Sequence, residues 1–202
     1  MADPIQIIIY RNTSVEDFTK TIADSSSRLD AGSSAAATAA IAASLLSRAA
    51  SEISDANSAD ERLEWFVRNT EILRNYMVKL IDEDVRCRSP LAKALTEGDE
   101  RKTEASRQVA VRICLEIVNM MGKGLEMAEE LMSYSDSLSS AHIMVSADLF
   151  YASSLAAGRY LLSMGEKSSD ETYRYVIKRE NELTMKAQKE CYERIRDCWQ
   201  KS

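Results

Sequence analysis

Residues 61–84 read ERLEWFVRNTEILRNYMVKLIDED, a stretch in which apolar side chains return at alternating steps of three and four. Steps of this length place side chains on one face of an α-helix. The positions that share the stripe are Leu63, Phe66, Thr70, Leu73, Met77, Leu80 and Asp84. The stretch therefore predicts a long helix with one face in a core. The capping box Ser58-Ala59-Asp60-Glu61 predicts where this helix begins.

Helical spacing recurs on both sides of this stretch. Further helices are expected at about residues 14–22, 33–53, 100–133, 140–164 and 168–198, the first opening at the capping hydroxyl of Ser14. Ser89-Pro90 predicts a stop or kink near Arg88, followed by a short helix that ends near Gly98. The helix over 140–164 is expected to be buried, because apolar residues occur all round it.

The last helix opens in the sequence at Ser168-Ser169-Asp170-Glu171, another capping box. Its inward positions are expected to be Tyr173, Val176, Ile177, Leu183, Ala187, Cys191, Ile195 and Cys198. The fold class predicted for residues 1–202 is all-α, a single-domain antiparallel multi-helix bundle. Residues 1–13 are expected to form an extended N-terminal segment, because Ile5 to Tyr10 is rich in β-branched residues.

Composition excludes several classes of function. The chain has 202 residues, a net charge of −6, and only six Gly and two Pro. The negative charge argues against nucleic acid as a partner, and the few chain breakers favour long helices. The uncharged residues 31–47 are mostly Ala and Ser, so no membrane span is expected. A single histidine, His142, argues against a metal site, and four scattered cysteines without a secretory signal favour a cytoplasmic protein with reduced thiols.

Asp84 is the strongest candidate for a chemical role, because a carboxylate stands where the stripe predicts an apolar side chain. Burial raises the pKa of a carboxyl group, and a pKa near neutrality suits a general acid or base. Asp82 and Glu83 are expected on flanking or exposed faces. The alternative is that the helix frays before Pro90 and leaves Asp84 solvated.

Two further features are candidate binding elements. Asp148 and Arg159 lie eleven residues apart, on one face of the expected buried helix, where they would bind a polar ligand or form an ion pair with another helix. The turn Asp30-Ala31-Gly32-Ser33-Ser34 opens the Ala/Ser helix, where free N–H groups favour an anion. The alternative for the turn is a plain capped helix with a small-residue packing face.

The order of these features resembles the formiminotetrahydrofolate cyclodeaminase and methenyltetrahydrofolate cyclohydrolase family. Residues 15–18 (VEDF) and 32–37 (GSSAAA) match the opening of that family, and 80–84 (LIDED) matches its Leu-x-Asp-x-Asp motif. Residues 146–149 (SADL) are similar to its Ser-Asp segment on a later buried helix. The resemblance implies that the second aspartate of the motif, Asp84, is the catalytic acid/base.

The resemblance also implies a substrate, a one-carbon-substituted tetrahydrofolate. It would be 5-formiminotetrahydrofolate for a cyclodeaminase or 5,10-methenyltetrahydrofolate for a cyclohydrolase, with no metal and no separate cofactor, in a homodimer. The residues expected to bind the substrate are Gly32, Ser33, Ser34, Asp82, Asp148 and Arg159. The alternative is a non-catalytic helical scaffold or regulatory protein, because the chain has Asp30-Ala31-Gly32-Ser33 where the family has proline and three glycines.

Overall fold

The computed structural model describes residues 9–56 and 60–201, and it contains helices without any strand in those ranges. The elements are η1 (Tyr10–Asn12), α1 (Val15–Ala23), α2 (Ala31–Ala56), α3 (Glu61–Glu97), α4 (Glu100–Met132), α5 (Ser137–Gly165) and α6 (Glu171–Trp199). The all-α prediction is confirmed. Within the described residues no helix is both long enough and apolar enough to cross a membrane.

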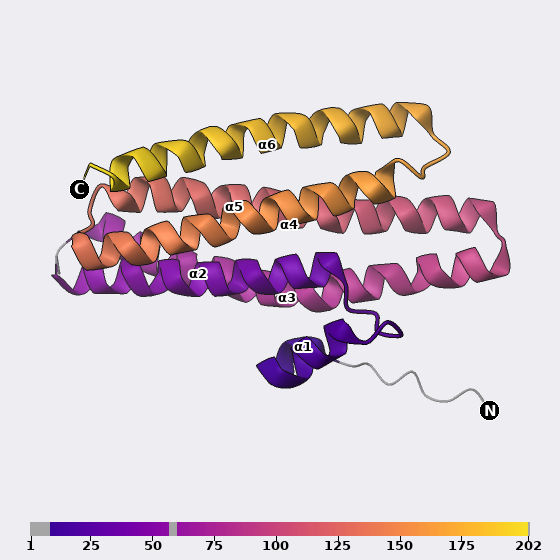
Figure 1. Cartoon of the computed structure of the whole chain (residues 1–202), viewed down its shortest axis with the longest axis horizontal. Helices are drawn as coiled ribbons and strands as arrows, with labels where there is room; N and C mark the ends of the chain where they lie inside the picture. Colours follow the sequence, from indigo (N-terminus) through magenta and orange to yellow (C-terminus); the bar gives the residue numbers. More distant parts are fainter. Residues whose placement is uncertain (1–8, 57–59, 202) are drawn as a thin grey trace.

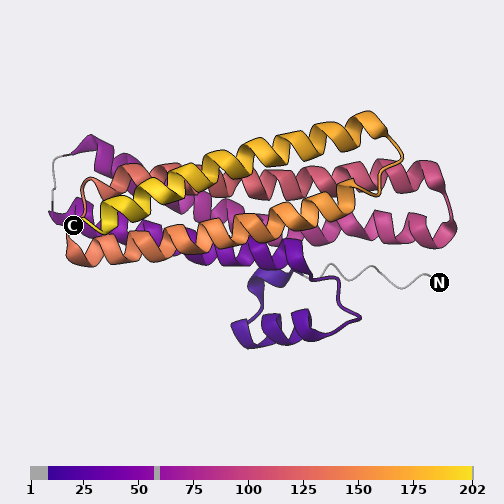
Figure 2. The same ribbon diagram turned by 45° about the horizontal axis from the view of Figure 1, so that its top comes forward.

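Five long helices run alongside one another and alternate in direction (Figure 1). Helices α2 and α4 each pack against α3 and α5, while α6 covers α4 and α5. The short helix α1 lies outside this bundle and buries no residue (Figure 2). The antiparallel multi-helix bundle is therefore confirmed, and any site must be built from side chains on facing helices.

Short polar side chains cap the helices at or within two residues of the predicted places. Ser14 accepts a hydrogen bond from the Asp17 N–H at 3.1 Å, as its capping box predicts. The residue that caps α3 is Asp60, and Ser58 lies outside the described residues. The residue that caps α6 is Asp170, not Ser168. Each aspartate directly precedes the first helical residue, where its carboxylate reaches the open N–H groups of the first turn.

The predicted stop of the helix near Arg88 is wrong, whereas the predicted helix end near Gly98 is confirmed. Helix α3 continues through Pro90 and ends only at Gly98, whose φ of 68° is left-handed. Proline removes a single N–H from the helical ladder. Val85, Leu91 and Ala94 are buried on both sides of Pro90, so packing keeps the helix in one piece. This continuity keeps Arg88 in helical register with Asp84.

Helix α2 buries small side chains, among them Ala36, Ala39 and Ala43, which are fully inaccessible. Small side chains let neighbouring helices approach closely. The Ser146 hydroxyl of α5 donates to the Ala42 carbonyl oxygen of α2 at 2.8 Å, which shows how near the two backbones are. Helix α2 also packs on α3, where the Asp84 side chain adjoins the first turn of α2.

Expectations for α5 and α6 also need correction. Helix α5 is not buried all round, since Val145 is 48% exposed and both charged residues of its centre are exposed. On α6, four of the expected core positions are exposed: Val176, Leu183, Ala187 and Cys198. Polar Asn181 and Gln188 are buried there instead, and Gln188 donates to the Val118 carbonyl oxygen at 2.8 Å. A polar side chain with such a partner can occupy a core position.

The expected extended segment 1–13 falls largely on residues 1–8, outside the described residues. Where the structure describes this segment, Tyr10–Asn12 form a 3-10 turn. Tyr10 is buried, and its backbone N–H donates to Asp82 Oδ1 at 2.8 Å. The expectation of extended backbone is therefore wrong for these three residues, because a carboxylate on α3 holds the turn in place.

Candidate functional site

Asp84 is completely buried in the interior of the bundle. The Ser33 hydroxyl donates to its Oδ2 at 2.6 Å, and Arg88 Nη2 lies 2.6 Å from the same oxygen. The alternative of a frayed helix with a solvated Asp84 is wrong. The stripe of apolar positions correctly predicted a carboxylate inside the core.

Gly32 makes room for this carboxylate. A Cβ atom at position 32 would lie 2.4 Å from Asp84 Oδ1 and 2.8 Å from its Cγ. Both distances are shorter than any tolerated contact, so the first turn of α2 can adjoin Asp84 only because residue 32 has no side chain. The glycine of the predicted anion-binding turn therefore makes room for the Asp84 carboxylate of this chain.

The predicted anion-binding turn is filled by carboxylates of this chain. Asp30 Oδ1 accepts a hydrogen bond from the Gly32 N–H at 3.0 Å, and the Ser33 N–H binds Asp84. The Ser34 hydroxyl donates to the Asp30 carbonyl oxygen at 2.6 Å. The start of a helix favours negative charge, and here it holds two aspartates.

Arg88 links these two aspartates. Its guanidinium forms ion pairs with Asp84 and Asp30, and Nη2 also donates to the Arg28 carbonyl oxygen at 2.7 Å. The Tyr160 hydroxyl of α5 donates to Asp30 Oδ2 at 2.5 Å. Burial raises the pKa of Tyr160 to about 12, so this hydroxyl stays protonated. The site is therefore a closed polar network contributed by α2, α3 and α5.

The pKa of Asp84 is raised to about 6. The main cause is burial, which disfavours the charged carboxylate. The hydroxyl and the backbone N–H of Ser33 act in the opposite direction and lower the pKa. A carboxyl group with this pKa can both release and take up a proton near neutral pH.

We expect the raised pKa of Asp84 to make the stability of the protein depend on pH. The folded state holds this proton more tightly than the unfolded chain does, so the stabilisation is complete below about pH 4 and is lost as the pH rises through about 6. The expected change in the free energy of unfolding is about 1–3 kcal/mol. Urea unfolding of the wild type and of Asp84→Asn between pH 4 and 7 measures it. Equal pH slopes in the two proteins would contradict the raised pKa, since the amide of the variant does not titrate.

Two thiols adjoin Asp84. Cys87 Sγ lies 3.0 Å from the Asp84 carbonyl oxygen, and Cys114 Sγ lies 4.0 Å from Asp84 Oδ1. Burial raises the pKa of Cys87 to about 12 and also raises the pKa of Cys114. Thiols that stay protonated are poor nucleophiles, which leaves Asp84 as the group suited to proton transfer.

Asp82 is buried, contrary to the expectation of a flanking or exposed position. It accepts hydrogen bonds from the N–H groups of Tyr10 and Arg11, at 2.8 and 3.4 Å, and Arg11 Nε lies 3.4 Å from its Oδ2. The covering turn η1 explains the burial. Asp82 therefore anchors the N-terminal turn two residues away from Asp84.

Asp148 and Arg159 are both exposed on α5, outside the network around Asp84. Asp148 accepts a hydrogen bond from the Tyr192 hydroxyl at 2.6 Å, and neither residue forms an ion pair with another described residue. The prediction that Asp148 and Arg159 lie together on a buried face of the helix is therefore wrong. Arg159 is next to Tyr160 in the sequence, whereas Asp148 lies about 18 Å from Tyr160 along the helix at 1.5 Å per residue.

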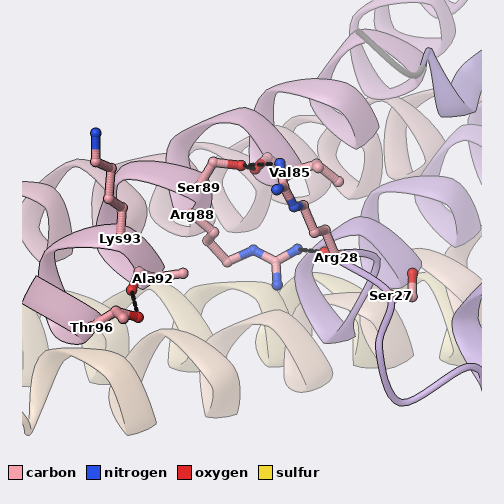
Figure 3. Close-up of a pocket in the computed structure, with 8 residues that line it drawn as sticks. All are labelled: Ser27, Arg28, Val85, Arg88, Ser89, Ala92, Lys93 and Thr96. Carbon is pink, nitrogen blue, oxygen red and sulfur yellow. Dashed lines mark hydrogen bonds between the residues drawn. The ribbon is translucent and has the colours of Figure 1, made fainter. Parts of the chain in front are cut away.

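An open groove of about 420 Å³ lies beside the network (Figure 3). Its walls come from the segment before α2 and from α3, and Arg88 reaches across it toward Arg28. The lining residues are Ser27, Arg28, Val85, Arg88, Ser89, Ala92, Lys93 and Thr96. The residues described here include no group of three or more His, Cys, Asp or Glu that could hold a metal ion.

Sequence reasoning missed Arg88 and Tyr160 as members of the site, and it named Asp30 only as part of the turn before the Ala/Ser helix. One signal was available for Arg88, which stands four residues after Asp84 and so shares its helix face. The predicted break before Pro90 concealed that relation. Tyr160 carried no such signal, because its partner Asp30 lies 130 residues away in the sequence.

Comparison with known proteins agrees with this architecture. The family model described as formiminotransferase-cyclodeaminase matches residues 14–182. The crystal structure of a formiminotetrahydrofolate cyclodeaminase from Thermotoga maritima superposes with a TM-score of 0.86, covering 94% of this chain and 96% of that one at 18% sequence identity. A search of curated proteins gives no match. The structural likeness concerns the fold.

Proposed function

Because the chain belongs to the formiminotransferase-cyclodeaminase family, we propose that it is an enzyme acting on a one-carbon-substituted tetrahydrofolate. The observation that supports this most strongly is the buried Asp84, held against Gly32 and Ser33 with its pKa raised to about 6. Proton transfer at nitrogen is the chemistry such a carboxyl group can perform.

In the cyclodeaminase reaction, Asp84 would first accept a proton and then donate it. In 5-formiminotetrahydrofolate whose formimino nitrogen is protonated (–CH=NH2⁺), N10 attacks the formimino carbon and forms the new C–N bond, the C=N π electrons move to the formimino nitrogen, and Asp84 takes the proton released from N10. Asp84 then returns the proton to the departing nitrogen, which leaves as ammonia when its C–N bond breaks. The product is 5,10-methenyltetrahydrofolate, and no electrons are gained or lost.

The cyclohydrolase reaction would use the same group on the methenyl compound. Asp84 takes a proton from water as its oxygen bonds to the bridging carbon, and a proton passes to N5 as the bond between that carbon and N5 breaks. The products are 10-formyltetrahydrofolate and one proton released to solvent. In both reactions folate is the substrate, with no separate cofactor.

The other expected substrate residues take different parts in this proposal. Gly32 and Ser33 position Asp84, Ser34 supports the start of α2, and Asp82 anchors η1 beside it. Arg159 would contact the substrate from the surface near Tyr160. Asp148 would contact only the far end of a long ligand, because of its distance along α5.

The proposal is tested by following the absorbance of the methenyl group. Purified protein is mixed with 5-formiminotetrahydrofolate in one cuvette and with 5,10-methenyltetrahydrofolate in another. Protein-dependent growth of the signal in the first would establish cyclodeamination, and protein-dependent loss in the second would establish hydrolysis. No change in either, with the protein folded, would overturn the proposal.

A second candidate, a non-catalytic scaffold, is favoured by one specific observation. The Asp84 carboxylate has no accessible surface, and Ser33 and Arg88 occupy its Oδ2. A site closed in this way would serve stability alone if Arg88 never left it. Thermal unfolding with folates present separates the two candidates, since a ligand that binds only the native state raises the melting temperature.

We further propose that two copies of the chain associate, in the cytoplasm, through the outward face of α2 and α5. Ile41 and Val145 are 58% and 48% exposed on these helices, next to the hydrogen bond between Ala42 and Ser146. No residue from Ala31 to Ser47 is charged. Such an uncharged, partly apolar face fits another copy of itself about a two-fold axis.

Val145→Glu is therefore expected to halve the mass measured in solution by light scattering. The charge would be buried without a partner at the centre of the interface. Ile72→Glu on α3 is the matched control, because Ile72 is also exposed, at 63%, but lies on another face. A wild type that runs as a monomer, or equal effects of the two changes, would contradict this interface.

A further inference from the structure

The guanidinium of Arg88 is bound as a ligand would be. All three of its nitrogens donate to acceptors of the bundle: the Asp84 and Arg28 carbonyl oxygens, the Ser33 hydroxyl, and the carboxylates of Asp30 and Asp84. The Arg88 side chain is only 15% exposed. Two carboxylates, one on α3 and one directly before α2, thus share one planar cation.

An amidinium group has the same recognition chemistry. It is planar, carries one positive charge spread over carbon and nitrogen, and offers parallel N–H donors to a carboxylate, as guanidinium does. The formimino group of the proposed substrate is an amidine and takes up a proton in neutral water. The two carboxylates that bind the guanidinium of Arg88 can therefore bind an amidinium group in the same way.

We propose that Arg88 is an internal occupant of an amidinium-binding site formed by Asp84, Asp30 and Ser33, and that an amidinium ligand binds when Arg88 withdraws into the adjacent groove. The inference deepens the proposed function, on which it rests for the identity of the natural ligand. Arg88 itself lines the groove of about 420 Å³, so its long side chain has space to move.

The charges around the groove keep the site closed when no ligand is present. Arg28 and Lys93 also line it, so a withdrawn Arg88 would stand near two other cations and leave two carboxylates without a partner. An amidinium ligand that enters the site supplies the positive charge that Asp84 and Asp30 lose when Arg88 withdraws. The affinity of the wild type for such a ligand is therefore reduced by the small fraction of molecules that are open.

Removal of the internal occupant should expose the site. We expect Arg88→Ala to bind formamidinium at least about tenfold more tightly than the wild type does, because no open state has to be populated first. The probe is formamidinium chloride, and the readouts are isothermal titration and a saturable rise in melting temperature. Tetramethylammonium chloride at equal concentration controls for salt, since it carries charge without N–H donors.

Two further variants make the test specific. Arg86→Ala is the matched control, because Arg86 is an exposed arginine of α3 paired with Glu83, and it should bind the probe no better than the wild type. Arg88→Ala/Asp84→Asn should lose the gained affinity. Equal effects of tetramethylammonium, equal binding by Arg86→Ala, or retained binding in the double variant would each overturn the proposal.

The wild type provides a measurement that does not depend on folding of the variants. In ¹⁵N NMR, formamidinium should speed solvent exchange of the Arg88 side-chain N–H groups, and tetramethylammonium should not. Unchanged exchange at rising formamidinium would overturn the proposal even if Arg88→Ala fails to fold. The probe contains no folate, so a protein that binds it but does not convert folates would refute the proposed function and leave the amidinium site standing.

Discussion

Asp84→Asn is expected to lower the turnover of the formimino or methenyl substrate by about 10²–10⁴-fold, the usual contribution of a positioned acid or base. The amide has the shape of the carboxyl group, and its oxygen can still accept hydrogen bonds from Ser33 and Arg88. It cannot take up or return a proton. Circular dichroism should show unchanged helix content, so the loss would lie in the chemistry.

Glu83→Gln is the matched control for this prediction. Glu83 is the neighbouring carboxylate, half-buried and paired with the exposed Arg86, so its neutralisation should leave turnover within about twofold of the wild type. Both variants are assayed by methenyl absorbance at the same protein concentration. Turnover retained by Asp84→Asn would remove Asp84 from the mechanism, whatever else the site does.

Gly32→Ala is expected to destabilise the protein by about 1–3 kcal/mol, the usual result of placing an extra group in a packed interior. The added Cβ would lie 2.4 Å from Asp84 Oδ1, so either α2 or the carboxylate must move. A displacement near 1 Å at a reacting group can cost about 10²-fold in rate. Turnover should therefore fall along with the melting temperature.

A double-mutant cycle tests the cause of this destabilisation. All three of the nearest atoms to the added Cβ belong to the Asp84 side chain. In an Asp84→Ala background the clash is absent, so Gly32→Ala should cost little there or stabilise α2, because alanine favours helix more than glycine does. An equal cost in both backgrounds would mean that Gly32 matters for its backbone conformation and not for its distance from Asp84.

The bundle was predictable because the long helices have clear periodic patterns and short polar caps. The burial of Asp84 followed from the same pattern, since a core-facing stripe ends on it. The contact between Arg88 and Asp84 could have been predicted from their spacing of four residues, but Pro90 was interpreted as the end of the helix. Packing on both sides of Pro90 outweighed the loss of one hydrogen bond.

Other features depend on contacts between distant parts of the chain. Asp82 is buried only because Tyr10 and Arg11 cover it, and no local pattern predicts that pairing. Asn181 and Gln188 are buried on α6, although their polarity favours the surface. The exposure of Asp148 and Arg159 was missed because the apolar residues of α5 include some, such as Val145, that face outward.

The network around Asp84 also determines when, during synthesis, this carboxyl group acquires its raised pKa. Ser33 and Asp84 emerge early from the ribosome, but the Tyr160 hydroxyl that holds Asp30 belongs to a helix made much later. A nascent chain that ends before α5 would carry Asp84 in water, with the ordinary acidity of an aspartate. Contacts between residues so far apart form late in folding. The raised pKa of Asp84 is thus acquired only after α5 has been made.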